Sequence, residues 1–147
     1  MKDPVSKPGH TISVRDLVEF VLRTGDLGGE REFVGSARAL AGIRGHQKIQ
    51  RSRPPGYLTE LPVEHTVETE EFTLQIRGRI DGLLITTEQV LLEEIKTVTG
   101  SWDHTADVLH WAQVKFYGFI HAKENALKEL VLQLVYLELP AGKVTEF

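Results

Sequence analysis

Apolar residues recur at helical spacing near the start of the chain. Ser13 precedes them and Asp16 follows it by three residues, which is the pattern of a capped helix start. Four apolar positions are spaced so that they share one helix face: Val14, Leu17, Val18 and Val21. The pattern predicts a helix that begins after Ser13 and ends at the glycine-rich residues 25–29.

Two further segments have helical periodicity. Residues 33–50 are predicted to form a helix despite three internal glycines, and the Pro-Pro-Gly sequence at 54–56 breaks the chain after it. Residues 106–125 are predicted to form another helix, because their apolar positions fall on one side. These positions are Leu109, Ala112, Phe116 and Ile120.

From Tyr57 onward the spacing changes to the alternation typical of strands. Residues 58–67 and 72–85 are predicted strands, and 90–97 is the hairpin partner of the second across a turn at 86–89. Residues 130–139, rich in leucine and valine, predict a buried strand. The turn-like residues 140–143 are expected to begin another strand.

The order of these elements predicts an α/β fold in which a mixed central β-sheet is flanked by helices (α-α-β-β-β-α-β). We expect residues 1–12 to be a flexible N-terminal lead and 13–147 to be a single domain. We also expect the chain to be a fragment of a longer protein, because it stops just after a new strand begins.

The composition is that of one soluble domain. The chain has 147 residues, 41% hydrophobic and 26% charged, which is enough to bury one core. It has no cysteine, which excludes disulfides, thiolate zinc sites, cysteine nucleophiles and iron–sulfur clusters. It has neither an apolar run that could span a bilayer nor a signal peptide. We therefore expect a cytoplasmic protein with no membrane partner.

Positive charge is concentrated in one segment. The net charge is −4, yet no acidic residue lies between Phe33 and Thr59. That stretch holds five cations: Arg38, Arg44, Lys48, Arg51 and Arg53. A basic segment on an acidic chain suits contact with a polyanion, although a solvated helix face explains the same charges equally well.

Three charged residues are expected to meet in the predicted hairpin. Strand alternation places Glu94 and Lys96 on one face and Glu93 on the other. Pairing across the turn brings Asp81 opposite the Glu93–Ile95 region. A divalent cation between buried carboxylates relieves the cost of burying their charge, and oxygen ligands favour magnesium or manganese. Taken alone, a cross-strand ion pair is the commoner explanation of such a set.

Other candidates lie on the predicted helices. His46 follows Gly45 near the end of the second helix. Gln113 and Tyr117 are four residues apart and so share one face of the last helix. Alone, each is more often a surface or packing residue.

Together, and in this order, these residues resemble the PD-(D/E)XK nuclease superfamily, and in particular its RecB-like exonuclease branch. That branch combines a helical histidine after a glycine, a G-x-x-D strand, a (D/E)-x-K strand and a helical Q-x-x-x-Y. The chain has GIRGH at 42–46, GRID at 78–81, EIK at 94–96 and QVKFY at 113–117. The resemblance covers residues 30–140 and implies a restriction-endonuclease-like core.

The resemblance implies a metal centre. Its ligands would be the carboxylates of Asp81 and Glu94, the main-chain carbonyl of Ile95 and the imidazole of His46. Glu64, on the first predicted strand of the hairpin region, is a candidate for an upstream acidic residue found in many members. Members with iron–sulfur clusters use four cysteines, so this chain would carry Mg²⁺ or Mn²⁺ and no cluster.

The resemblance also implies how the substrate is handled. Lys96 would orient and activate the attacking water beside the catalytic carboxylates. Gln113 and Tyr117 would position the site and contact the substrate strand. We expect the nucleic acid to lie along four residues of the basic segment: Arg44, Lys48, Arg51 and Arg53.

These features together predict a metal-dependent nuclease that hydrolyses DNA, as an exonuclease on single strands. Nuclease domains of this branch are often fused to helicases, so a helicase domain in the same or a partner chain is an expected partner. Three alternatives stay open: a non-catalytic nucleic-acid-binding domain on the same fold, an RNA-cleaving phosphodiesterase, and an α/β interaction domain whose motifs are coincidental.

Overall fold

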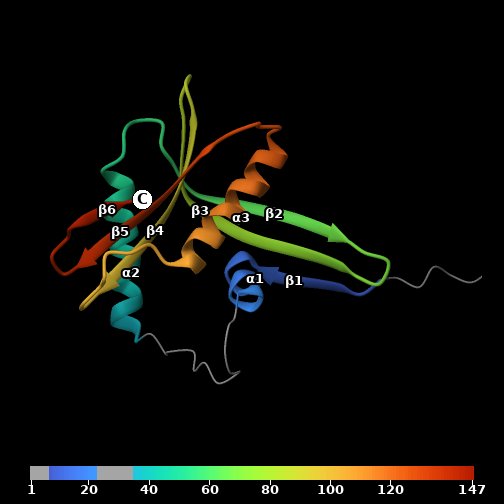
Figure 1. Cartoon of the computed structure of the whole chain (residues 1–147), viewed down its shortest axis with the longest axis horizontal. Coiled ribbons are helices and arrows are strands. Elements are labelled where there is room, and N and C mark those ends of the chain that lie inside the picture. Colours follow the sequence, from blue (N-terminus) through green and yellow to red (C-terminus); the bar gives the residue numbers. More distant parts are fainter. Residues whose placement is uncertain (1–6, 23–34) are drawn as a thin grey trace, which may run out of the picture.

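The computed structural model describes residues 7–22 and 35–147 (Figure 1). Within these ranges the chain forms β1 (Gly9–Ser13), α1 (Val14–Val21), α2 (Ser36–Arg51), β2 (Leu58–Glu68), β3 (Thr73–Ile85), β4 (Val90–Thr99), α3 (Val108–Glu124), β5 (Val131–Leu139) and β6 (Val144–Glu146). The predicted glycine-rich end of the first helix, and the first residues of the second, lie outside the described ranges.

The described strands form one mixed sheet in the order β1-β3-β4-β5-β6, with β2 paired to β3 away from this path. The β2–β3, β3–β4 and β5–β6 pairs are antiparallel, and the β1–β3 and β4–β5 pairs are parallel. Helices cover both faces, so the predicted α/β class with a mixed sheet flanked by helices is confirmed.

Alternate residues of the same strands pack against different helices. Leu92 on β4 belongs to the larger core cluster, together with Val114 of α3. Its near neighbour Ile95 belongs to a second cluster, together with Ile49 of α2. Because successive strand residues point to opposite faces, α3 and α2 lie on opposite sides of the sheet.

The N-terminal segment corrects one prediction. Residues 9–13 are a strand and not part of a flexible lead, because they run parallel to β3 with Gly9 opposite Thr73 and Ser13 opposite Arg77. Ile12 is the only large apolar residue of this strand, so hydrophobic alternation could not reveal it. Backbone hydrogen bonds to β3 hold it, and pairing of this kind leaves no sequence pattern of its own.

The helix caps follow the sequence. The hydroxyl of Ser13 accepts a hydrogen bond from the Asp16 N–H at 2.9 Å, as expected of a capped start. The carboxylate of Asp107 accepts one from the Leu109 N–H at 2.7 Å, so α3 begins at Val108, two residues later than predicted. The last short strand, β6, confirms that residues after the 140–143 turn return to the sheet.

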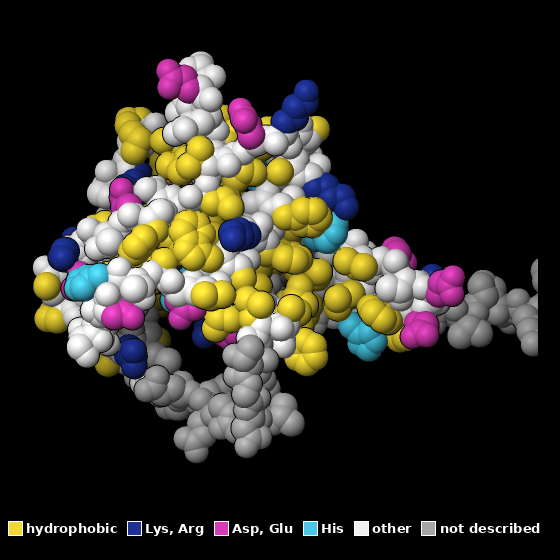
Figure 2. Space-filling view, in the orientation of Figure 1, with side chains coloured by type: hydrophobic (Ala, Val, Ile, Leu, Met, Phe, Trp, Pro, Cys, Tyr) yellow, Lys and Arg dark blue, Asp and Glu magenta, His cyan; other side chains and the backbone are white. Residues whose placement is uncertain are grey.

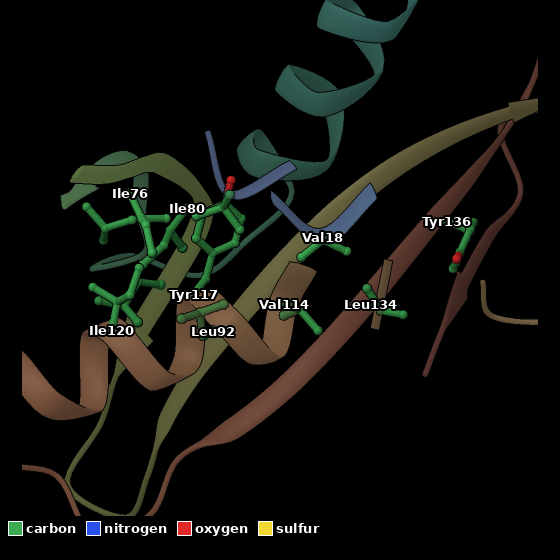
Figure 3. Close-up of a cluster of buried hydrophobic side chains, with 12 residues drawn as sticks. Val18, Ile76, Ile80, Leu92, Val114, Tyr117, Ile120, Leu134 and Tyr136 are labelled. Atoms are coloured by element: carbon green, nitrogen blue, oxygen red, sulfur yellow. The ribbon is translucent and has the colours of Figure 1, made fainter. Parts of the chain in front are cut away.

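The larger core lies between α3 and the sheet. Figure 3 shows Ile76 and Ile80 of β3 beside Tyr117, which projects from α3 with its hydroxyl at the far end. The outer face of α3 is also apolar: the side chains of Val108 and Phe119 are 71% and 51% exposed. Figure 2 shows hydrophobic side chains gathered over the middle of the same face of the molecule.

No helix among residues 7–22 and 35–147 is both long enough and apolar enough to cross a membrane.

Candidate metal centre at a strand fork

Strands β3 and β4 separate at Asp81. Their backbone pairing runs from Ile85–Val90 to Gly82–Glu93 and stops there. The carboxylate of Asp81 enters the opening, where its Oδ2 accepts a hydrogen bond of 2.7 Å from the Ile95 N–H. We call this point, with Asp81 on one strand and Glu94 on the other, the strand fork. The structure therefore confirms the prediction that Asp81 lies opposite the Glu93–Ile95 region.

Glu94 and Lys96 share one face of β4, as strand alternation predicts. The ammonium Nζ of Lys96 lies 2.7 Å from Glu94 Oε1 and donates a hydrogen bond of 3.0 Å to Gln113 Oε1. Glu94 is only 3% exposed, and its second oxygen, Oε2, is buried without a hydrogen-bond partner in the described structure. A buried carboxylate oxygen in this state is costly, and a bound cation would satisfy it.

Burial changes the acidity of both fork carboxylates. It raises the pKa of Glu94 from 4.5 to about 7, against the opposing effect of the Lys96 ammonium. It also raises the pKa of Asp81, against the opposing effects of His46 and the Ile95 N–H. Without a cation, both groups are therefore poorer anions than exposed carboxylates, which is common where a ligand supplies the missing positive charge.

His46 reaches the fork because α2 approaches β4 closely. A Cβ on Gly45 would lie 2.5 Å from the Thr97 methyl group, so the helix backbone can come this near only with glycine there. The imidazole Nδ1 of His46 then lies 3.7 Å from Asp81 Oδ1. The close packing of α2 on β4 thus explains why a glycine precedes the histidine in GIRGH.

Glu60 is the acidic residue that the sequence prediction missed. Register places it directly across from Asp81, because Thr59 pairs with Gly82 and Leu61 pairs with Ile80. The Glu60 backbone has a φ of 56°, in the left-handed region that non-glycine residues seldom adopt. Such local strain is common at functional sites.

One ligand atom from each of His46, Glu60 and Asp81 lies within 4.8 Å of the others, so these three residues can hold a metal ion. The Glu60 carboxylate is fixed from two sides. Gln50 Nε2 donates to Glu60 Oε1 at 2.8 Å and to the Asp81 main-chain oxygen at 2.9 Å, while Arg79 Nε lies 2.6 Å from Glu60 Oε2.

Glu64, the predicted acidic residue, is outside this group. It lies across from Arg77 and forms an exposed ion pair with it at 2.7 Å. Counting the register of the β2–β3 hairpin through the turn before Thr73 would have identified Glu60 as the residue across from Asp81.

Glu93 points to the opposite face, as predicted, but its side chain is 1% exposed and makes polar contacts there. Its carboxylate receives Arg53 Nη2 at 2.6 Å and accepts a hydrogen bond from the Tyr57 hydroxyl at 2.5 Å. Arg53 also reaches Glu146 on β6 at 2.8 Å. The guanidinium of Arg53, which the sequence predicts to contact nucleic acid, is thus held between two carboxylates.

Three other residues predicted to contact nucleic acid lie on the side of α2 away from His46. Arg44 and Lys48 each lie two positions from His46, which is about 200° around the helix. Together with exposed Arg51 they form what we call the distal basic face. The sequence placed these cations near His46 along the chain, but the helix turns them away from the fork.

Gln113 and Tyr117 share a helix face and interact with each other, but their further partners differ. Gln113 contacts Lys96, whereas Tyr117 is 5% exposed and packs on Gly78, where a Cβ would lie 2.5 Å from its ring. Burial, the largest effect, raises the Tyr117 pKa. Tyr117, which the sequence predicts to contact the substrate strand, has its side chain enclosed in the core.

Comparison with known proteins gives support for the fold. No family model matches the chain, and no curated protein matches it either. A solved structure of the protein SSO0001 superposes with a TM-score of 0.63 at 19% sequence identity, covering 100% of this chain and 68% of the other. Likeness at this identity shows that the two chains share the fold of the sheet and its helices.

Proposed function

We propose that this chain is a divalent-metal-dependent nuclease that hydrolyses phosphodiester bonds of DNA. The observation that carries the proposal is the strand fork. It holds two buried carboxylates of raised pKa, one of them with a buried oxygen that lacks a partner, beside an ammonium group. An arrangement of this kind is costly for a purely structural ion pair.

The donor set suits Mg²⁺ or Mn²⁺. Two ligand atoms about 2.1 Å from such an ion lie about 3 Å apart in cis and about 4 Å apart in trans. The 3.7 Å between His46 Nδ1 and Asp81 Oδ1 lies between these two values, so one ion could contact both atoms after a small side-chain adjustment. The Ile95 carbonyl fits as well, because N–H and C=O of one strand residue point to the same side and this N–H points to Asp81. Glu94 Oε2 and Glu60 complete the candidate ligands.

When bound, the cation would supply positive charge at the scissile phosphate. Lys96 is held between Glu94 and Gln113, so its ammonium has a fixed place beside the fork. From there it would orient the attacking water and offset charge that develops on the phosphate. Gln113 would act by positioning Lys96, and Tyr117 by fixing the GRID strand through Gly78.

The choice of DNA and a helicase partner are supported by the sequence resemblance alone, and a cytoplasmic location by the sequence composition. The test is incubation of the protein with end-labelled DNA and RNA, single- and double-stranded, in Mn²⁺, Mg²⁺ or EDTA. We expect cleavage of DNA that needs the metal and is lost in Asp81→Asn but kept in Glu64→Gln. Cleavage in EDTA, or its absence with every substrate and metal, would overturn the proposal.

A further inference from the structure

Two clefts meet along one side of α2. The first, of about 340 Å³, lies between α1, α2 and α3, and Lys96 and Gln113 form part of its wall. The second, of about 490 Å³, lies toward β2 and β3, and Glu60, Arg79 and Asp81 form part of its wall. The two clefts are therefore on either side of the strand fork.

Three residues of α2 line both clefts: Ala39, Gly42 and His46. They are spaced by three and four positions and so form one line along the helix. Two of them, Ala39 and Gly42, have the smallest side chains available, so they project little into the passage between the clefts. His46, the third, stands at the candidate metal centre.

Resting on the proposed function, we propose that a single DNA strand runs through both clefts across the Ala39–Gly42–His46 line. The scissile phosphate would lie at His46, with the strand continuing into the first cleft on one side and the second on the other. The two clefts would thus hold the nucleotides that flank the cleaved bond.

The depth of the site favours a single strand over a duplex. Asp81 and Glu94 are 9% and 3% exposed, so a phosphate must descend below the surface to reach them. A flexible single strand can bend into such a recess, whereas the stiff backbone of a duplex cannot follow it without deformation. Positively charged grooves that track one backbone are the usual means of binding single strands.

The charges in the clefts agree with this path. Arg15 and Arg38 line the first cleft with Glu19 as its carboxylate, and Arg79 lines the second with Glu60 and Asp81, which are candidate metal ligands. The Arg15–Glu19 and Arg79–Glu60 pairs involve arginines that are 73% and 67% exposed. The exposed Arg15–Glu19 pair is weak, so the Arg15 guanidinium can turn to a phosphate at little cost, whereas Arg79 stays with Glu60 and contributes its positive charge to the wall of the second cleft.

The chain offers a matched pair of variants for the test. Ala39 and Ala37 are both exposed on α2, two positions apart, but only Ala39 lines the clefts. Ala39→Trp would fill the passage, whereas Ala37→Trp adds the same side chain about 200° around the helix, in its first turn.

The measurement is fluorescence anisotropy of a labelled oligodeoxythymidine with Ca²⁺ as a metal that slows cleavage, together with Mn²⁺ affinity by calorimetry. We expect Ala39→Trp to weaken strand binding by about tenfold or more while Mn²⁺ affinity stays the same, which corresponds to about 1.4 kcal/mol. Ala37→Trp should match the wild type. Arg15→Gln should lower the salt slope by about one counterion, whereas Lys48→Ala should not.

Equal binding by the Ala39→Trp and Ala37→Trp variants would overturn the path, as would binding of a duplex as tight as that of the single strand. Tighter binding of the matching oligoribonucleotide would overturn DNA as the ligand. These failures are separable from failure of the proposed function. Metal-dependent cleavage that needs Asp81 would survive a wrong path, whereas loss of that cleavage would remove both.

Discussion

The carboxylate of Asp81 takes the place of a missing rung in the β3–β4 ladder by accepting a 2.7 Å hydrogen bond from the Ile95 N–H. The same carboxylate presents its other oxygen to His46. Asp81 thus closes the gap between the separating strands and also lies at the candidate metal centre. These two roles can be separated by substitution, because an amide keeps the hydrogen bond that closes the gap and loses the negative charge that a metal ion needs.

Asp81→Asn should abolish Mn²⁺ binding and leave the protein folded. The amide oxygen can still accept the Ile95 hydrogen bond, and the neutral group avoids the burial cost that raises the Asp81 pKa. At neutral pH its unfolding midpoint in EDTA should therefore equal or exceed that of the wild type. Asp81→Ala, which loses the hydrogen bond as well, should unfold at lower denaturant. Calorimetry and urea unfolding check both statements, and Mn²⁺ binding by Asp81→Asn at wild-type affinity would contradict them.

Lys96→Gln should separate catalysis from metal binding. The amide can still donate to Glu94 and Gln113, so the side chains keep their places, but the positive charge is lost. We expect kcat to fall by about 10²- to 10⁴-fold, as when a positioned catalytic group is removed, with Mn²⁺ affinity within a few-fold of the wild type. The check is steady-state kinetics beside calorimetry; an unchanged kcat would place Lys96 outside the chemistry.

Glu60→Gln should weaken Mn²⁺ binding, because Glu60 shares the ligand group of His46 and Asp81. A loss of about tenfold is expected when one supporting carboxylate of a metal site is neutralised. Glu64→Gln is the matched control, since Glu64 lies on the same strand and pairs with an arginine of β3 in the same way. Equal Mn²⁺ affinities for the two variants would show that Glu60 only anchors Arg79.

Glu93→Ala should cost stability instead of activity. It would remove the buried partner of the Arg53 guanidinium, which keeps Glu146, and it would leave the Tyr57 hydroxyl without its acceptor; losing hydrogen bonds to a charged group costs about 1.5–3 kcal/mol. Urea unfolding measures the free energy, and the double variant Arg53→Met/Glu93→Leu should recover part of it. The folded fraction of Glu93→Ala should keep wild-type Mn²⁺ affinity, because Glu93 points away from the fork.

Metal affinity should rise with pH through neutrality. The Glu94 pKa is about 7 in the folded protein, so below that pH a cation must displace a proton from Glu94. We expect Mn²⁺ affinity to fall by about tenfold per pH unit below 7 and to level off above it. Glu94→Gln should bind weakly and with a flatter pH dependence, which calorimetry from pH 6 to pH 8 can show.

The same pKa shift has a consequence for stability. The folded-state pKa of Glu94 lies above its unfolded value of 4.5, so the metal-free protein loses stability as pH rises from about 4.5 through 7. Added Mn²⁺ should restore it most strongly at and above pH 7. Thermal unfolding with and without Mn²⁺ across this range measures the difference, and a midpoint raised equally at pH 5 and pH 8 would contradict it.

The parts of the fold and site that depend on local spacing could be predicted from the sequence. The period-two pattern of β4 placed Glu94 and Lys96 on one face and Glu93 on the other, and the short turn after Ile85 brought Asp81 to Glu94. Both follow from strand geometry over a few residues. The strand β1 was not predicted from the sequence, because it is defined by its backbone pairing to β3.

The parts that depend on packing could not be predicted. Lys48 is close to His46 in sequence but on the far side of the helix, and the orientation of a helix is set by which face meets the sheet. Arg53 was expected to contact nucleic acid, and the sequence did not reveal that it is bound by Glu93 and by Glu146, which is ninety-three residues away. Predicting that Glu60 lies across from Asp81 requires the pairing register of the β2–β3 hairpin. The left-handed backbone of Glu60 cannot be predicted from its residue type.

The most direct test of the account is the release of nucleotides from end-labelled single-stranded DNA in Mn²⁺ by the wild type, Asp81→Asn and Glu64→Gln. The account predicts digestion by the wild type and by Glu64→Gln, no digestion by Asp81→Asn, and none by any of them in EDTA. Digestion by Asp81→Asn at the wild-type rate, or by the wild type in EDTA, would contradict a metal-dependent nuclease centred on the strand fork.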